Sequence, residues 1–226
     1  MQEDTLKQFL PATERWFRKT FGEPTKIQRE AWPAIADGKH VLVSAPTGTG
    51  KTLSAFLVFI DQLGGLAERG ELKEELYVIY VSPLKSLAGD IRENLRKPLE
   101  GIGAEAPGES KAESRPGNPF IGQIQAAIRT GDTPQKERQR MVKHPPHILI
   151  ITPESLYLML TSKSGRQVLK TAKAIILDEL HALIDTKRGA HLMLSVARLD
   201  KLCGRRLQRI GLPVPGTGRY LCTFHG

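Results

Sequence analysis

The sequence predicts an α/β fold in which a mostly parallel β-sheet carries helices on both faces. Short runs of β-branched and aliphatic residues recur along the chain, and longer helical patterns lie between them. Most of these runs are apolar throughout rather than alternating, which is typical of strands buried on both faces. Alternation of strand and helix favours parallel neighbours. In such sheets, ligands bind beyond the carboxyl ends of the strands.

The strands are predicted at residues 40–44, 76–81, 124–128, 147–151 and 174–177. Helical patterns cover stretches such as residues 53–66, 84–95 and 190–202. Near the end of the chain, apolar residues recur at helical spacing and form one stripe: Leu192, Val196, Leu199 and Cys203. This stripe predicts a helix face packed on the sheet, with Cys203 in the core.

The composition is that of a globular domain. The chain has 226 residues, of which 40% are hydrophobic and 25% charged, and these values argue against disordered, collagen-like and membrane-spanning proteins. The two cysteines form no disulfide framework, and the polar first residues differ from a signal peptide, so we expect a soluble cytoplasmic protein. The net charge of +9 suits a polyanionic partner, although a solvated basic surface explains it equally well.

A phosphate-binding loop is predicted between the first strand and the next helix. The segment reads Ala45-Pro46-Thr47-Gly48-Thr49-Gly50-Lys51-Thr52. Glycines let backbone N–H groups point at phosphate oxygens, and the helix N-terminus adds partial positive charge. In this pattern Lys51 reaches the β- and γ-phosphates and the Thr52 hydroxyl binds Mg²⁺. The alternative is a glycine-rich turn without a ligand.

Two acids follow the last of these buried strands, in the order Asp178-Glu179-Leu180-His181. Asp178 is predicted to hold Mg²⁺ through its water shell, and Glu179 to orient or deprotonate the attacking water. The alternative is that both acids cap the following helix. The phosphate loop at the same sheet edge favours the catalytic interpretation.

With these motifs in place, the chain resembles the motor core of superfamily 2 helicases of the DEAD/DEAH-box type. More narrowly, it is similar to the large helicase-related (Lhr) family, over nearly all of residues 5–212. The similarity extends beyond the nucleotide motifs to residues 31–35 (AWPAI), 82–90 (SPLKSLAGD) and 186–191 (TKRGAH). It implies a RecA-like P-loop NTPase lobe that uses ATP and Mg²⁺, with single-stranded DNA or RNA, or a DNA–RNA hybrid, as partner.

The resemblance also implies an adenine-recognition element at residues 21–28 (FGEPTKIQ). Phe21 would pack on the base and Thr25 would belong to the same element. The Gln28 carboxamide offers both a donor and an acceptor for the base edge. The alternative is an ordinary helix start with Gln28 exposed. His181 resembles the residue that links the nucleotide site to a second lobe.

Three segments resemble the family's nucleic-acid contacts, and each follows a strand and precedes a predicted helix. They are Ser82, Pro83 and Lys85; then Arg129, Thr130, Gly131 and Asp132; then Thr152, Pro153 and Glu154. Such turns leave N–H groups and hydroxyls for phosphates and carry no sequence information. Ordinary helix capping explains any single one equally well. Basic residues that extend this surface, or form a solvated face, are Lys136, Arg138, Arg140 and Lys143.

The expected organisation is N-terminal helices with the adenine element at residues 1–38 and the RecA-like lobe at 39–212. A flexible loop is expected at 101–118, which is rich in Gly, Pro, Glu and Ser. Residues 213–226 are aperiodic, and the family has there a Ser-Ala-Thr motif followed by a second lobe. We therefore expect a frameshift or premature stop at this point, with the final strand leaving an open sheet edge.

The function favoured by these residues is the first motor lobe of a helicase that couples ATP hydrolysis to translocation or strand separation. In the family a second lobe supplies arginines that stabilise the transferring phosphoryl group, so we expect slow hydrolysis and no unwinding by this chain alone. One alternative is another P-loop ATPase, such as a transporter or protease motor. The other is a catalytically silent module that binds ATP or nucleic acid. The motifs leave DNA versus RNA, and polarity, undecided.

Overall fold

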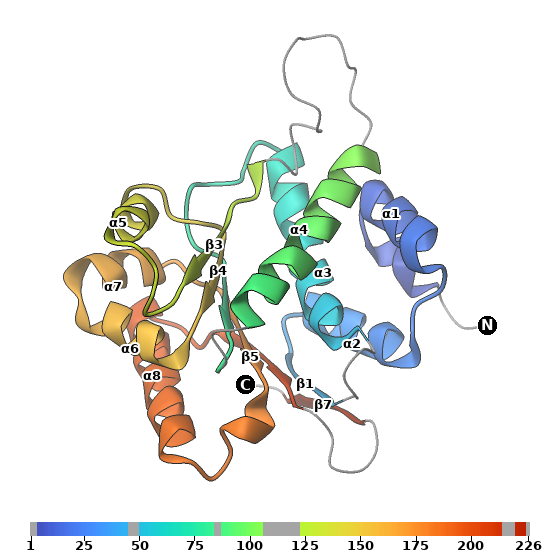
Figure 1. The fold of residues 1–226 in the computed structure, drawn as a ribbon. Coiled ribbons are helices and arrows are strands. Elements are labelled where there is room, and N and C mark those ends of the chain that lie inside the picture. Colours follow the sequence, from blue (N-terminus) through green and yellow to red (C-terminus); the bar gives the residue numbers. More distant parts are fainter. Residues whose placement is uncertain (1–3, 45–49, 84–86, 106–122, 214–219, 225–226) are drawn as a thin grey trace, which may run out of the picture.

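The computed structural model describes residues 4–44, 50–83, 87–105, 123–213 and 220–224. Within these residues one sheet has the strand order β3-β4-β2-β5-β6-β1-β7 (Figure 1). All neighbours pair in parallel except β7, which is antiparallel to β1. The strands are β1 (His40–Ser44), β2 (Val78–Val81), β3 (Ala126–Arg129), β4 (Ile148–Ile151), β5 (Ala174–Asp178), β6 (Gln208–Leu212) and β7 (Tyr220–Phe224).

The register brings the carboxyl ends of the parallel strands to one edge of the sheet. Val81 of β2 lies opposite Ile151 of β4 and Leu177 of β5. Gly211 of β6 lies opposite Leu177 and Leu42, so β1 and β5 end on either side of β6. Every turn that follows a parallel strand therefore emerges along the same edge.

Helices cover both faces of the sheet (Figure 1). Tyr80 belongs to the apolar cluster under α1 to α4, and its neighbour Val81 belongs to the cluster under α5 to α8. Successive side chains of a strand point to opposite faces, which explains why these strands are apolar at every position. The helices are η1 (Thr5–Gln8), α1 (Pro11–Phe21), α2 (Lys26–Ala36), α3 (Lys51–Glu68), α4 (Leu87–Glu105), α5 (Gln135–Lys143), α6 (Pro153–Thr161), α7 (Lys163–Leu169), η3 (Leu180–Ala182) and α8 (Lys187–Cys203).

The predicted α/β fold is confirmed, and each predicted strand is present with shifts of one or two residues at its ends. The predicted apolar stripe faces the core, because Leu192, Val196 and Leu199 of α8 are buried. Cys203 is only partly buried and packs at the margin of the same cluster. In the described part of the chain, no helix has both the length and the apolar character needed to cross a membrane.

The prediction of a loop at residues 101–118 is wrong for its first residues, because α4 continues to Glu105. Ile102 is buried in the core, and Trp16 of α1 packs so closely on Gly101 that a Cβ there would lie 2.0 Å from the indole nitrogen. Packing between α1 and α4 therefore stabilises helix α4 beyond Gly101, although the local sequence there is typical of a loop. The remainder of the expected loop, residues 106–118, lies outside the described residues.

The prediction that residues 213–226 are aperiodic is also wrong in part. Residues 220–224 form strand β7, which pairs with the outer side of β1. An edge strand presents unpaired N–H and C=O groups, and a short segment of Tyr, Leu, Thr and Phe is well suited to pair with it. The sheet edge expected to stay open just before residue 213 is wrong as well. β6, which ends at Leu212, lies inside the sheet, with β5 on one side and β1 on the other.

Candidate nucleotide and nucleic-acid site

The phosphate loop connects β1 to α3 at the carboxyl edge of the sheet. Of its predicted residues, Ala45, Pro46, Thr47, Gly48 and Thr49 lie outside the described residues. Gly50 ends the loop as the N-cap of α3, with a φ of 80°. A left-handed backbone at this point favours glycine, because a Cβ is strained there. Lys51 and Thr52 then form the first turn of α3.

Lys51 is buried at the sheet edge, with 8% of its surface exposed. Its ammonium donates a hydrogen bond to the backbone carbonyl of Pro213 at 3.0 Å. Burial lowers the pKa of Lys51, while the charges of Glu179 and Asp178 act to raise it. The predicted phosphate-binding lysine thus lies in the electrostatic field of the two predicted catalytic acids.

Asp178 ends β5 and is also 8% exposed. Its Oδ2 accepts a hydrogen bond from the hydroxyl of Tyr80, and its Oδ1 accepts one from the backbone N–H of Glu179 at 2.9 Å. Burial raises the pKa of Asp178, and the Tyr80 hydrogen bond is the strongest influence that opposes the increase. The two hydrogen bonds hold the carboxylate in one orientation.

Glu179 has an unusual backbone for a non-glycine residue, with φ 50° and ψ 39°. Such a left-handed conformation costs on the order of 1 kcal/mol and is enriched at functional sites. The turn places Glu179 Oε2 at 3.2 Å from His181 Nε2. Asp178, Glu179 and His181 therefore occupy one short segment beside Lys51, as the sequence motif predicts.

The side chains at this edge have the oxygen donors that Mg²⁺ prefers. Tyr80 hydrogen-bonds to Asp178, and the Thr52 side chain interacts with the same phenol, so both predicted ligands adjoin one residue. Across the part of the chain that the structure describes, no three His, Cys, Asp or Glu side chains gather to hold a metal. Mg²⁺ at Thr52 and Asp178 would therefore take its other ligands from phosphate and water, as is usual for this ion.

The predicted adenine-recognition element starts α2 through a capping box. Thr25 Oγ1 accepts the Gln28 N–H at 3.4 Å, and Gln28 Oε1 accepts the Thr25 N–H at 2.9 Å. The alternative of an exposed Gln28 is wrong, because this side chain is 4% exposed. Its Nε2 would lie 2.9 Å from a Cβ on Gly50, so Gln28 contacts the end of the phosphate loop. The Thr-x-x-Gln pattern could have predicted this cap.

Phe21 lies at the end of α1 and is 52% exposed. Its ring contacts Trp16 edge-on, with centroids 5.6 Å apart. The structure therefore leaves a large part of the ring accessible beside the start of α2, where the resemblance implies packing on a base.

The three predicted nucleic-acid segments follow β2, β3 and β4 along the shared edge. Thr152 is the N-cap of α6 and accepts the Ser155 N–H at 3.4 Å, so the capping interpretation holds for this residue. Ser82 is buried, and its hydroxyl has no hydrogen-bond partner among the residues that the structure describes. Lys85 lies outside the described residues.

The segment after β3 does not cap a helix, contrary to expectation. Arg129, Thr130, Gly131 and Asp132 form the end of β3 and a turn, while α5 starts only at Gln135 with Pro134 as its N-cap. Arg138 braces the turn by donating to the carbonyls of Gly131 and Thr133, both at 2.6 Å. Of the basic residues expected to extend the surface, Arg138 is thus used within the protein.

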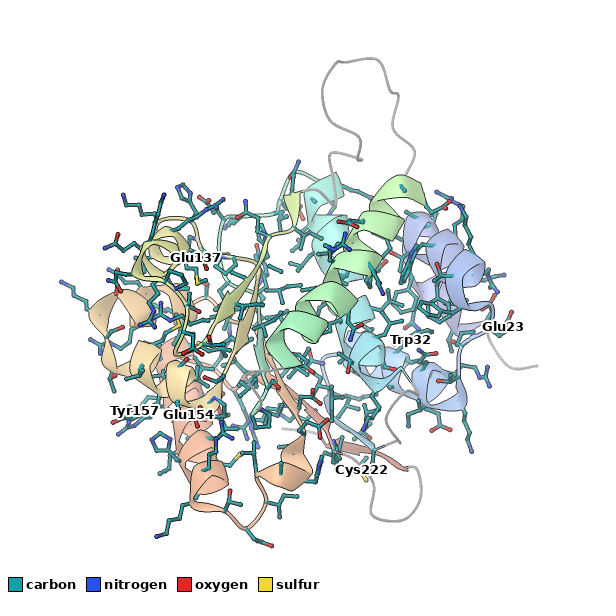
Figure 2. The ribbon with its side chains drawn as sticks, viewed as in Figure 1. Glu23, Trp32, Glu137, Glu154, Tyr157 and Cys222 are labelled. Atoms are coloured by element: carbon teal, nitrogen blue, oxygen red, sulfur yellow. The ribbon has the colours of Figure 1, made fainter. Side chains whose placement is uncertain are left out.

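The sequence motifs did not identify two residues of this edge, Tyr80 and Arg188. The Arg188 guanidinium donates to Glu154 Oε1 at 2.6 Å and Oε2 at 3.1 Å, and also to the Pro83 carbonyl at 2.8 Å. Glu154 lies at the start of α6, beside α8 (Figure 2). Arg188 therefore joins the turn after β2 to the first turn of α6. The only sequence signal was the resemblance of residues 186–191.

Comparison with known proteins gives a family match over most of the chain. Residues 25–212 match the family model described as DEAD/DEAH box helicase. The "ATP-dependent helicase Lhr-Core" of Methanothermobacter thermautotrophicus is 47% identical over 219 residues, which is 95% of this chain and 24% of that protein. The "Lhr helicase/ probable uracil glycosylase" of Mycolicibacterium smegmatis is 48% identical over 209 residues, covering 92% of this chain and 13% of that protein.

Solved structures agree with these matches. The structure of Mycobacterium smegmatis helicase Lhr bound to ssDNA and AMP-PNP has a TM-score of 0.81 at 47% identity, and covers 92% of this chain and 25% of that one. The DEAD-box helicase Mss116 bound to ssRNA and UDP-BeF has a TM-score of 0.75 at 19% identity, over 93% and 40% of the two chains. This second similarity shows the fold alone, which is that of a RecA-like helicase domain. The chain spans about a quarter or less of the length of the Lhr proteins.

Proposed function

The chain belongs to the DEAD/DEAH box helicase family, and we propose that it is an ATP-binding motor lobe of an ATP-dependent nucleic-acid helicase. The observation that carries this proposal is the meeting of Lys51, Asp178 and Glu179 at the edge where β1 and β5 end. Strand-end acids beside a phosphate-loop lysine are the arrangement by which P-loop enzymes handle a nucleoside triphosphate.

Each of these residues has a role that follows from its chemistry. The Lys51 ammonium exchanges the Pro213 carbonyl for oxygens of the β- and γ-phosphates. Thr52 and Asp178 would hold Mg²⁺, which would supply neutralisation of charge on the phosphates. Glu179 orients the attacking water, and its strained backbone keeps the carboxylate beside His181. Gln28 contacts Gly50 and so lies where the adenine of a nucleotide on the phosphate loop can be read.

Nucleic acid is proposed to cross the turns after β2, β3 and β4. The basic net charge and the partly exposed Arg188–Glu154 pair, which is tied to the Pro83 carbonyl, support a surface for a phosphate backbone. The similar Lhr structure holds ssDNA. A second RecA-like lobe, which the family resemblance implies, would supply the arginines that complete hydrolysis and the closure that drives movement.

The first experiment is thermal unfolding with and without Mg·ATP, for the wild type, Lys51→Ala and the exposed control Lys97→Ala. A ligand that binds only the folded state raises the unfolding midpoint. We expect an increase for the wild type and Lys97→Ala and none for Lys51→Ala. The same increase in all three proteins, or in none, contradicts the proposal.

The second experiment measures ATP hydrolysis with and without single-stranded DNA or RNA. We expect slow turnover by this chain, because phosphoryl transfer loses roughly 10³–10⁵ in rate without its arginine. Turnover that rises strongly with nucleic acid, and is lost in Lys51→Ala, would show that a second lobe is not essential. Binding of a labelled single strand without turnover would indicate a lobe that binds nucleotide and nucleic acid but lacks the second lobe needed for catalysis.

A further inference from the structure

We propose that Tyr80 is a positioning residue of the nucleotide site, whose buried hydroxyl fixes the Asp178 carboxylate for Mg²⁺. This inference rests on the proposed function. Tyr80 lies in β2, next to β5, and its side chain is 0% exposed. The hydroxyl donates to Asp178 Oδ2 in the interior of the protein.

The carboxylate of Asp178 is held at both oxygens. The Glu179 N–H binds Oδ1 and the Tyr80 hydroxyl binds Oδ2, so the plane of the carboxylate is set by two donors from different strands or turns. An ionised carboxylate has about four acceptor positions, so both oxygens keep capacity for water around a metal. Without the Tyr80 hydroxyl, one oxygen would lose its fixed direction. Outer partners of this kind tune metal affinity in other proteins.

The ring of Tyr80 ties this carboxylate to the helix that follows the phosphate loop. It stacks on Phe56 of α3, with centroids 4.8 Å apart and planes 17° from parallel. Phe56 and Thr52 are four residues apart and therefore share one face of α3. The Thr52 side chain interacts with the Tyr80 phenol as well. One tyrosine thus hydrogen-bonds to one predicted Mg²⁺ ligand and packs on the helix that presents the other.

A tyrosine that served only to fill the core could satisfy its hydroxyl on any backbone carbonyl. Tyr77, in the segment that leads into β2, shows the contrast: its hydroxyl accepts the Lys73 N–H at 3.2 Å, and its ring lies beside the Lys173 ammonium. Tyr77 is therefore a matched control at the other end of the strand. Its hydroxyl has no contact with the nucleotide residues among those that the structure describes.

The test compares Tyr80→Phe with Tyr77→Phe and the wild type in binding a fluorescent ADP analogue, with Mg²⁺ and with EDTA. Tyr80→Phe keeps the ring and its stacking on Phe56 and removes only the hydroxyl. We expect it to require about 10-fold more Mg²⁺ for half-maximal binding, a loss of the size seen for outer partners of metal ligands. Affinity in EDTA should match the wild type. A purely structural role would weaken both conditions together.

Equal Mg²⁺ dependence in Tyr80→Phe and the wild type would overturn the inference, and so would an equal loss with Mg²⁺ and with EDTA. If Tyr80→Phe does not fold, Phe56→Leu takes its place, because losing the stacked ring releases the Tyr80 side chain and so loosens the hold of its hydroxyl on Asp178. The same Mg²⁺-specific loss is then expected, and its absence overturns the inference. Failure of the wild type to bind the analogue in either condition would instead refute the proposed function, and the inference with it.

Discussion

The ammonium of Lys51 and the carbonyl of Pro213 are joined by a 3.0 Å hydrogen bond, although 162 residues separate them. β1 and β6 are parallel neighbours, so the residue that follows β6 comes to lie beside the first turn of α3. If Lys51 binds phosphate as proposed, a nucleotide phosphate and this carbonyl compete for the same ammonium. The segment after β6 would then be coupled to the occupancy of the phosphate loop.

Lys51→Met should separate folding from nucleotide binding. Burial lowers the pKa of Lys51 more than the nearby acids raise it, so the charged lysine is not a net source of stability. We expect the free energy of unfolding to change by less than about 1 kcal/mol, and the increase in melting temperature caused by Mg·ATP to disappear. Chemical denaturation and thermal shifts measure the two effects. A loss well above that limit would mean that the bond to Pro213 stabilises the fold.

Asp61→Asn should remove a pH dependence of stability. Asp61 of α3 accepts the Leu10 N–H at the start of α1 at 2.8 Å, and burial raises its pKa from 3.8 to about 6. A carboxyl with a raised pKa binds protons more tightly in the folded state, so the protein loses stability as the pH rises from about 4 to about 6. The full penalty above pH 6 is about 3 kcal/mol.

We therefore expect the wild type to gain stability between pH 7 and pH 5, and Asp61→Asn to show a flatter profile and greater stability at pH 7. Urea denaturation at several pH values measures this, with the exposed Asp37→Asn as control. Parallel profiles for the wild type and Asp61→Asn would refute the assignment.

The Arg188–Glu154 pair should act as one unit in binding a single strand. Arg188→Lys keeps the charge but cannot make the two-point contact with Glu154 and the bond to Pro83 together. Both side chains are partly exposed, so we expect a modest loss of about 1 kcal/mol, or roughly 5-fold, in affinity for single-stranded DNA. Glu154→Gln should have a similar effect, and the double variant should lose little more.

Fluorescence anisotropy with a labelled oligonucleotide measures these affinities. Arg198→Lys, on the same helix, is the matched control, because its guanidinium lies over Tyr157 instead. Losses that simply add in the double variant would show that Arg188 and Glu154 act independently.

Gly189→Ala should destabilise the start of α8. A Cβ at this position would lie 1.9 Å from the Leu183 carbonyl oxygen, and the Gly189 N–H is held by Thr186 Oγ1 at 3.0 Å. The helix must therefore shift or give up its cap, at a cost of about 1–3 kcal/mol. Urea denaturation measures the loss against Lys187→Ala, an exposed neighbour. A cost within 0.5 kcal/mol, roughly that of an ordinary surface change, would contradict the close packing.

The sequence by itself determined the fold class and the residues that meet at the sheet edge. Apolar runs separated by helical patterns require a sheet buried on both faces, and such a sheet sends the turns after its strands to one edge. Gly50, Lys51 and Asp178 could be predicted as site residues because each belongs to a short motif next to a strand. Their chemistry depends on neighbours within a few residues.

Only the tertiary structure decided which distant side chains hold those motifs. Tyr80 and Asp178 are 98 residues apart and Arg188 and Glu154 are 34 apart, and no local pattern pairs them. The position of β6 inside the sheet, and of β7 beside β1, followed from which strand edges remained to be paired. Hydrogen bonds and packing partners at long range depend on the assembled sheet, because the order of strands in space differs from their order along the chain.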